Sequence, residues 1–386
     1  MKIAYYCQHV LGIGHFHRSL EICRELAKRH QLTMITGGAP VKTTEKSFSF
    51  HQLPGLVMDA EFKNLTPCDK SQTLEKTKEI RAEKLRDFFR RFQPEVFLIE
   101  LYPFGRKAFR FELDPVLEGI HHEKLCRCLT FCSVRDILVE RHDGEKFENR
   151  VISTLNRFFN GVLVHGDKNF IPLQTTFSRV DDIAAPVVYT GYVTRQRHQQ
   201  ERSNIRSSLG FSPETLLIVA SIGGGGVGIE LLYALVEAMK HIENESVKLQ
   251  IFTGPYASEE DFQNLADMSG NTISVDRFTT EFTCWLHAAD LSVSMAGYNT
   301  TMNILAAGVP ALLYPFAQNQ EQRMRVERLE GKVPFKILEK AELQPRALAA
   351  HILRQLQEKR YSSPINLDGA VNTAAQIELW SAAMRS

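Results

Sequence analysis

Two glycines, two histidines and an arginine stand within residues 12–19, GIGHFHRS, shortly after an apolar run. In open α/β sheets, ligands bind in loops of this kind at the carboxyl ends of the strands. An imidazole titrates near pH 6.5, so it can accept a proton at about neutral pH. We therefore expect His15, next to Gly14, to act as a general base, and His17 to pack against the fold or cap the following helix.

Two other interpretations of this stretch have less support. A dinucleotide fingerprint, G-x-G-x-x-G, needs a glycine where His17 stands, and the second strand ends in TMITGG without an acid to hold a ribose. A metal site lacks a third ligand near the two histidines. Cys126, Cys128 and Cys132 also cluster, but their spacing is not that of a metal site, and we expect core residues. We predict no metal and no cofactor.

Four consecutive glycines, Gly223 to Gly226, lie between an apolar run and an amphipathic helix, in SIGGGGVG. Such a loop can point several amides at one ligand, and the start of a helix adds partial positive charge, so a phosphate is favoured there. The lysine of a P-loop is absent, because Ile229 follows Gly228. A sharp turn is the alternative, but it needs fewer glycines than this.

A second anion site is predicted around residues 294–316. Gly297 and Asn299 suit the turn after a strand, and Asn299, Thr300 or Thr301 can cap the next helix. Gln322 lies in an amide-rich segment, residues 318–322, that suits a hydroxyl-rich ligand because an amide both donates and accepts. Composition does not separate this interpretation from an ordinary solvated loop.

Strands alternate with helices around these loops in both halves of the chain. Apolar runs separated by amphipathic helices predict parallel strands with right-handed crossovers. We predict an α/β fold with two Rossmann-like, doubly wound parallel sheets. The expected divisions are an N-terminal domain over residues 1–190, a linker over 191–213, a C-terminal domain over 214–370, and a helix over 371–386 that is a candidate to pack back on the N-terminal domain.

Charge and hydropathy narrow the class of protein. The net charge of the 386 residues is +1, which provides no general field for nucleic acid. No apolar run approaches the roughly 20 residues that span a bilayer, and the first residues lack the apolar segment of a signal peptide. We therefore expect a cytoplasmic protein with no transmembrane segment and no nucleic-acid partner.

Together these motifs resemble the GT-B glycosyltransferases, and family 28 most closely. The resemblance is most specific at residues 221–228 and 278–323, which include AGYNTTMNILAAGVPALLYPF, and weaker at 12–19; residues 40–125 match nothing that we can name. It implies two domains facing a cleft, and a metal-independent, inverting hexosyltransferase. The donor implied is a nucleoside-diphosphate sugar, UDP-linked by preference, and the acceptor is an unidentified hydroxyl.

The resemblance also implies roles for residues. His15 matches the base, and Gln322 matches a glutamine that touches the donor sugar. By this resemblance, the glycine loop and the helix start near Asn299 and Thr300 would bind the diphosphate. The backbone at Phe278 and Thr279 would contact the nucleobase. The full donor side comprises Gly223, Gly224, Gly225, Gly226, Phe278, Thr279, Gly297, Asn299, Thr300, Asn303 and Gln322.

The sequence departs from the family pattern at two positions. Asn303 stands where the family has a glutamate on the ribose, and Arg323 where a second glutamine is common. An amide binds a ribose more weakly than a carboxylate does, which puts the donor nucleotide in question. No D-x-D motif occurs, so amides and helix dipoles are the expected partners of the diphosphate.

The acceptor side is the least defined. Gly14, His17, Glu100, Tyr102 and Arg106 are its candidates, the last three because residues 100–113 mix aromatic and basic side chains after a strand. An ordinary surface loop is an equal alternative. The acceptor is left open between a lipid-linked molecule and a glycan. Peripheral membrane contact through residues 79–92 is also open, although a solvated helix face is favoured.

Two other functions compete with glycosyl transfer. A nucleotide-sugar epimerase could use the same fold, but the N-terminal loop lacks the Arg-Pro-Glu signature associated with that class. A non-catalytic nucleotide-sugar-binding protein is suggested by Asn303, as a site that has lost its glutamate.

Overall fold

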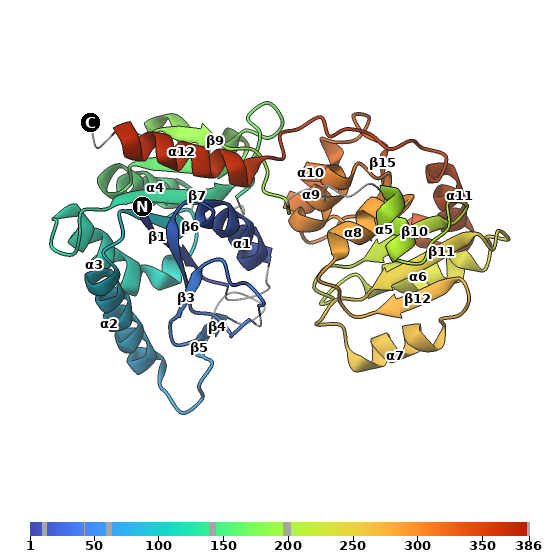
Figure 1. Cartoon of the computed structure of the whole chain (residues 1–386), viewed down its shortest axis with the longest axis horizontal. Coiled ribbons are helices and arrows are strands. Elements are labelled where there is room, and N and C mark those ends of the chain that lie inside the picture. Colours follow the sequence, from blue (N-terminus) through green and yellow to red (C-terminus); the bar gives the residue numbers. More distant parts are fainter. Residues whose placement is uncertain (10–13, 42, 59–63, 139–143, 196–201, 384–386) are drawn as a thin grey trace. The chain divides into compact units, whose positions relative to one another are not determined.

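The chain folds into two compact units. The computed structural model describes residues 1–9, 14–41, 43–58, 64–138, 144–195 and 202–383. The first unit comprises Met1–Val193 together with Asp368–Ser386, and the second comprises Thr194–Leu367. Each is a parallel sheet flanked by helices (Figure 1). The predicted α/β class with two parallel sheets is therefore confirmed.

The sheet of the first unit has seven strands in the order β3-β2-β1-β6-β7-β8-β9, all parallel. Its inner strands are buried on both faces, which explains their continuous apolar runs. The strands are β1 (Lys2–Cys7), β2 (Gln31–Thr36), β3 (Ser49–Gln52), β6 (Val96–Glu100), β7 (Leu129–Arg135), β8 (Gly161–His165) and β9 (Val187–Tyr189), and β4 (Leu56–Met58) and β5 (Leu65–Pro67) form a separate antiparallel pair.

Helices cover both faces of this sheet. They are α1 (Gly14–Ala27), α2 (Leu74–Phe92), α3 (Arg110–His121), α4 (Gly144–Phe158) and α12 (Gly369–Ala383), with short 3₁₀ turns η1 (Lys107–Phe109), η2 (Leu173–Thr175) and η3 (Val180–Asp182). Two apolar cores result. One packs under α2, α3 and α4, and the other under α1 and α12.

The second unit has a six-stranded parallel sheet in the order β12-β11-β10-β13-β14-β15. Its strands are β10 (Leu216–Ser221), β11 (Val247–Phe252), β12 (Ile273–Asp276), β13 (Leu291–Met295), β14 (Ala311–Tyr314) and β15 (Phe335–Ile337). Its helices are α5 (Arg202–Ser208), α6 (Ile229–Met239), α7 (Glu259–Asp267), α8 (Phe282–Ala288), α9 (Tyr298–Ala307), α10 (Gln320–Glu327) and α11 (Pro345–Gln355), with the 3₁₀ turn η4 (Lys340–Leu343).

Both sheets reverse their strand order next to the strand that enters first. In the first unit β1 lies between β2 and β6, and in the second β10 lies between β11 and β13. The carboxyl ends of strands at such a reversal form the usual ligand crevice of an open α/β sheet. Each sequence motif singled out above follows one of these strands or a neighbour.

The last helix belongs to the first unit. Gly369 donates its amide to the carbonyl of Tyr192, and α12 then packs against α1, with Ala374 and Ile377 fully buried. The Trp380 ring stacks on Phe131 with centroids 5.0 Å apart. Among the helices that the structure describes, none is both long enough and apolar enough to cross a membrane.

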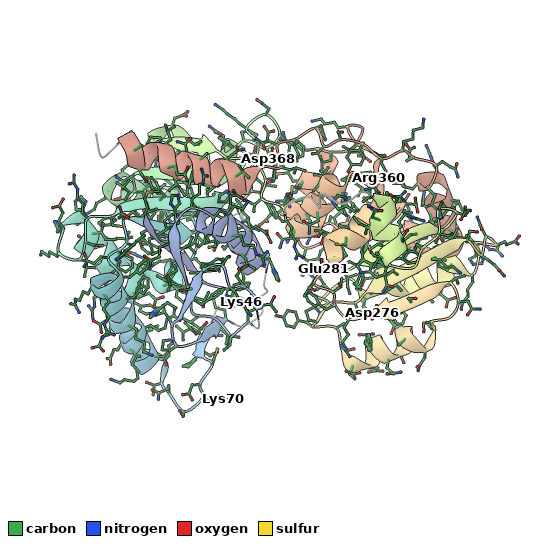
Figure 2. The ribbon with its side chains drawn as sticks, viewed as in Figure 1. Lys46, Lys70, Asp276, Glu281, Arg360 and Asp368 are labelled. Atoms are coloured by element: carbon green, nitrogen blue, oxygen red, sulfur yellow. The ribbon has the colours of Figure 1, made fainter. Side chains whose placement is uncertain are left out.

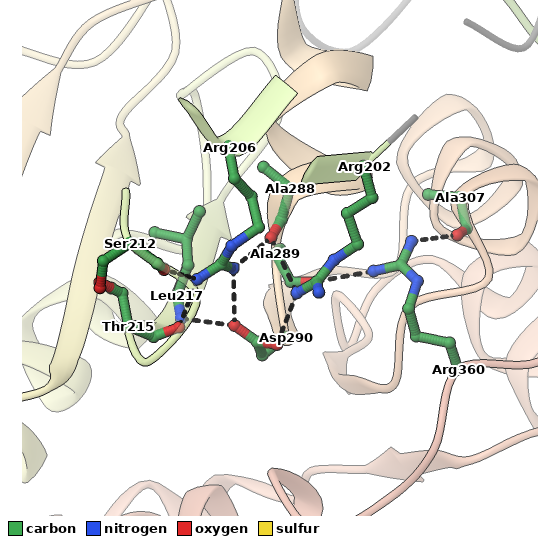
Figure 3. Close-up of polar contacts among 10 residues, drawn as sticks. All are labelled: Arg202, Arg206, Ser212, Thr215, Leu217, Ala288, Ala289, Asp290, Ala307 and Arg360. Carbon is green, nitrogen blue, oxygen red and sulfur yellow. Dashed lines mark hydrogen bonds and ion pairs between the residues drawn. The ribbon is translucent and has the colours of Figure 1, made fainter. Parts of the chain in front are cut away.

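A cluster of arginines fixes the start and end of the second unit (Figure 3). Arg202 and Arg206 of α5 bind the carboxylate of Asp290 at 2.6 and 3.1 Å. Arg360, on the segment that returns to the first unit, donates to the carbonyl of Ala289 at 2.7 Å. The segment predicted as a linker, residues 191–213, thus contains α5, whose Arg206 is almost fully buried. Residues 196–201 of that segment lie outside the described residues.

Candidate functional site

Helix α1 carries His15 at the carboxyl edge of the first sheet. The helix begins at Gly14 and buries Phe16, Leu20 and Cys23 against that sheet, while the His15 side chain keeps 22% of its surface exposed. His17 lies about 200° further around the helix and packs edge-on against Phe16. Gly12 lies outside the described residues.

Glu100 is the last residue of β6, and its side chain is completely buried. Its Oε1 accepts from His15 Nδ1 at 2.5 Å and from Arg18 Nη2 at 2.7 Å. Its Oε2 accepts from Arg106 Nη2 at 3.3 Å. One carboxylate from β6 thus holds a histidine of α1 and arginines from two elements.

These contacts assign the tautomer of His15. A carboxylate only accepts, so Nδ1 carries the proton and Nε2 keeps a lone pair. Nε2 has no hydrogen-bond partner in the described part of the chain. Burial, opposed by the Glu100 charge but reinforced by Arg106 and Arg18, lowers the pKa of His15 to about 4. Burial alone would raise the pKa of Glu100, but His15 and the two arginines hold it well below its usual value. At neutral pH the pair is a neutral imidazole and a carboxylate.

The loop after β6 brings Arg106 to this site but not Tyr102. Leu101 and Arg106 both have left-handed backbone conformations, with φ of 66° and 57°. Tyr102 points into the core, 2% exposed, and donates its hydroxyl to Asp114. Both residues were predicted for the acceptor side, and of the two only Arg106 lies beside His15 and Glu100.

The glycine loop after β10 is interlocked with the loop after β11. A Cβ at Gly225 would lie 2.6 Å from Ala257 N and Thr253 O, and a Cβ at Gly254 would lie 2.4 Å from Gly223 O. Tyr256 donates its amide to Gly224 O at 2.9 Å. The loops can only approach this closely without side chains, so part of the glycine run serves packing.

Other parts of the glycine loop are open. Gly226 has ordinary φ, and a Cβ there would meet no atom within 4 Å. The amides of Gly224 and of residues 226–228 donate no hydrogen bond to the described chain. Gly228 caps α6 without a side-chain bond, so the helix also presents its positive end here. This arrangement suits an anion.

Helix α9 begins earlier than predicted. Its N-cap is Gly297, with no side-chain hydrogen bond, so the expectation that Asn299, Thr300 or Thr301 caps the helix is wrong. Those residues lie in its first turn. The Tyr298 ring, at the start of the helix, lies 5.0 Å from the guanidinium of Arg325. Gly297 has an ordinary φ and open space around it. Asn303 lies further along α9, half-buried.

Gln322 lies in the first turn of α10, and the oxygen of its side-chain amide is already used in a hydrogen bond. Its Oε1 accepts from the Phe316 amide at 3.0 Å, while its NH₂ group has no partner in the described chain. Asn319 caps α10 by accepting from the Gln322 amide. The side chain is therefore oriented as a donor at the end of β14.

The loop between β12 and α8 runs from Asp276 to Glu281, which Figure 2 labels. Phe278 and Thr279 belong to this loop. The Phe278 side chain is 53% exposed, and the Thr279 hydroxyl accepts from the Glu281 amide. Arg195 donates to the carbonyl of Thr280 and lies 3.7 Å from Glu281. Arg195, which lies in the segment predicted as a linker, therefore contacts this loop.

Residues 219–377 match the sequence profile of the glycosyltransferase family 28 C-terminal domain. This confirms the resemblance drawn from the motifs. The matched segment contains every predicted donor-side residue, from the glycine loop to Gln322. It also runs past the second unit into α12, which packs in the first unit.

Curated relatives agree with this family 28 match. A UDP-N-acetylglucosamine--N-acetylmuramyl-(pentapeptide) pyrophosphoryl-undecaprenol N-acetylglucosamine transferase of Helicobacter pylori is 29% identical over 160 residues, 40% of this chain and 44% of that enzyme. The alignment thus spans less than half of that relative. An uncharacterized glycosyltransferase of Methanosarcina mazei is 23% identical over 337 residues, 83% of this chain and 81% of that protein.

Solved structures identify the fold of the whole chain. The glycotransferase of kitacinnamycin superposes with a TM-score of 0.63 at 15% identity, covering 98% of each chain. The MurG of Acinetobacter baumannii superposes with a TM-score of 0.60 at 15% identity, covering 98% of this chain and 100% of that one. The chain therefore has the GT-B fold.

One further site residue was missed from the sequence. Arg18 shares Oε1 of Glu100 with His15, and it lies three residues after His15 in α1, on the same helix face. That spacing was available as a signal, but its meaning depends on Glu100, more than eighty residues away.

Proposed function

We propose that the chain is an inverting glycosyltransferase that moves a hexosyl group from a nucleoside-diphosphate sugar, preferably UDP-linked, to an acceptor hydroxyl. The observation that carries this proposal is the run of unbonded amides at the glycine loop, within a segment that matches the family 28 C-terminal domain. The H. pylori relative, named for a UDP-sugar donor, supports the preference for UDP.

The donor's diphosphate is assigned to the second unit. The amides of residues 226–228 and the starts of α6 and α9 supply donors and positive partial charge, which stabilise a departing nucleoside diphosphate. The backbone at Phe278 and Thr279 is assigned to the base, Asn303 to the ribose, and the NH₂ group of Gln322 to the sugar.

His15 is assigned the role of general base, which removes the proton of the acceptor hydroxyl. Its Nε2 takes the proton as the hydroxyl oxygen attacks the anomeric carbon, and the bond to the diphosphate breaks. Glu100 then stabilises the imidazolium through Nδ1. Glu100 is buried and already bound by three donors, so it is not placed to attack the sugar itself. We therefore infer a single displacement with inversion, in which His15 is the base.

Gly226 gives the sharpest test of the donor site. The fold tolerates a methyl group there, since its φ is ordinary and no atom lies within 4 Å. Gly226→Ala should therefore leave the melting temperature unchanged or slightly raised, yet weaken UDP binding about tenfold or more by obstructing the diphosphate. Isothermal titration with UDP measures this loss.

Gly270→Ala is the matched control, because Gly270 also has open space around it but lies away from the carboxyl edge, just before β12. It should bind UDP as the parent does. If UDP, GDP and TDP all fail to bind the parent chain, or if Gly226→Ala binds UDP normally, the donor assignment is wrong.

A further inference from the structure

Arg106 is a buried arginine with most of its hydrogen-bonding capacity unused. Its side chain is 9% exposed, and its guanidinium makes a single hydrogen bond to the described residues, the 3.3 Å contact with Glu100. Its Nε is buried without a partner. A guanidinium carries five N–H donors, and buried donors are nearly always satisfied in native proteins.

The loop that presents Arg106 is held in an uncommon shape. Leu101 and Arg106 both have positive φ, which non-glycine residues seldom adopt. The Gly105 amide closes the loop on the Leu101 carbonyl at 2.6 Å, and a Cβ at Gly105 would lie 2.7 Å from the Leu101 side chain. The guanidinium is therefore positioned by the backbone rather than by a strong ion pair.

Among the described residues, Arg106 shares its one counter-charge with a second arginine. Arg18 and Arg106 face the one carboxylate of Glu100, and the neighbouring histidines, His15 and His9, are neutral at pH 7. Arg106 contributes to the lowered pKa values of both histidines, which places it close to each. His9 is 6% exposed, and its Nδ1 also has no partner.

We propose that Arg106 binds an anionic group of the acceptor, a carboxylate or a phosphate, beside the hydroxyl that His15 deprotonates. This proposal rests on the proposed function. An anion satisfies the unused N–H donors with charge-assisted hydrogen bonds, which are roughly twice as strong as those that a neutral hydroxyl would accept. The planar guanidinium matches the paired oxygens of carboxylate and phosphate.

The test uses the full chain without a donor, and probes of the two anion classes: inorganic phosphate and D-glucuronate, with D-glucose as the neutral counterpart. Phosphate should also bind the glycine loop, so calorimetry alone would mix two sites. The readout is therefore the NMR signal of the His15 ring in ¹³C-histidine-labelled protein, assigned with His15→Ala.

We expect a saturable shift of the His15 signal with glucuronate, with phosphate or with both, and none with glucose. The anion that shifts the signal identifies the acceptor group. Arg106→Gln should weaken that binding about tenfold or more. Lys107→Gln removes an equal charge from an exposed neighbour and should leave it unchanged.

An unmoved His15 signal with both anions, or equal binding to the parent and Arg106→Gln, would overturn the proposal. Arg106→Lys keeps the positive charge but lacks the paired N–H donors of a guanidinium. Partial anion binding by this variant would show that weaker binding reflects lost recognition and not a folding defect. Because no donor is present, this outcome is independent of the UDP measurements that test the proposed function.

Discussion

Two arginines and a histidine share one carboxylate at the end of β6. Burial disfavours the charged imidazolium of His15 most strongly, and Arg106 and Arg18 add to this effect while Glu100 opposes it. The consequence is a histidine that stays neutral over the whole range in which unperturbed histidines titrate. Its free nitrogen is therefore available as a base even in mildly acidic solution.

The pH dependence of transfer should report this effect. In the proposed mechanism the neutral form of His15 is the active one. Its pKa is about 4, so kcat/KM should not fall as pH drops from 7 through 6, but should fall as pH approaches and passes 4. Nucleoside diphosphate release across this range measures it, and the NMR titration of His15 gives the same pKa directly.

His15→Ala provides the control for this profile. It should lower the rate by about 10²–10⁴-fold, the usual loss for a general base, while UDP still binds. Its residual rate should lack the fall near pH 4. A parent enzyme whose rate instead declines through pH 6.5 would contradict the assignment of a neutral, buried base.

For the individual residues of the site, the sequence predicted the residue types but not their hydrogen-bond partners. The loop position and the glycine frame pointed to His15, and Glu100 was placed on the acceptor side. Their hydrogen bond joins positions 85 residues apart, and only the pairing of β1 with β6 brings them together. Tyr102 shows the converse, since burial removed a residue that its neighbours in the sequence had favoured.

Among the secondary-structure elements, the periodicity of the sequence was informative and the ends of helices were not. The apolar runs KIAYYC, residues 2–7, and EVFLIE, residues 95–100, predict strands, and the structure has β1 and β6 there, both central in the sheet. Helix α9 was expected to begin at a polar cap, but it begins at Tyr298 after the glycine cap Gly297, and the Tyr298 ring contacts Arg325 of α10. Similarly, Gly225 was assigned to ligand binding, whereas its role in packing depends on Thr253 and Ala257 of another loop. Local preferences cannot anticipate such distant contacts.

Asp290 is the point at which one residue joins several elements of the second unit. It accepts from Arg202, from Arg206 and from the Leu217 amide, and so connects α5 to the start of β10 (Figure 3). Asp290→Ala would leave the guanidiniums without a counter-charge. It should cost about 2–4 kcal/mol, below the full cost for a buried pair because Asp290 is 22% exposed.

Amide hydrogen exchange in β10 and β13 measures that loss locally. Glu237→Ala is the comparison, because its ion pair with Lys240 is exposed and should be worth less than about 1 kcal/mol. Equal protection in the two variants would mean that the cluster does not stabilise the sheet.

For the whole molecule, the main consequence concerns the first unit, which is built from two separate stretches of chain. Its core under α1 includes Val193 from one stretch and Ala370, Ala374 and Ile377 from the other. The expected divisions set residues 371–386 apart as a helix that is a candidate to pack back on the N-terminal domain, and the contacts of α12 lie in the first unit.

Ile377→Ala tests how far the first unit depends on α12. Ile377 is completely buried, and its truncation should destabilise the unit by about 2–5 kcal/mol. Hydrogen exchange should accelerate in β1 and β7 but not in β10. Leu379→Ala, on the same helix but 63% exposed, should change stability by less than about 0.5 kcal/mol. Similar effects of the two substitutions would show that α12 is not part of the core.

The return of α12 also has a consequence for biosynthesis. When residue 193 leaves the ribosome, the β7 surface that Trp380 will cover is still bare, and it stays so while residues 194–367 are made. At roughly 5–20 residues per second this takes about 10–35 s. The second unit is one continuous stretch and can finish folding first. The first unit, whose residues are translated first, thus completes its folding last. During that interval we expect chaperones to bind the apolar surface that α12 will later cover.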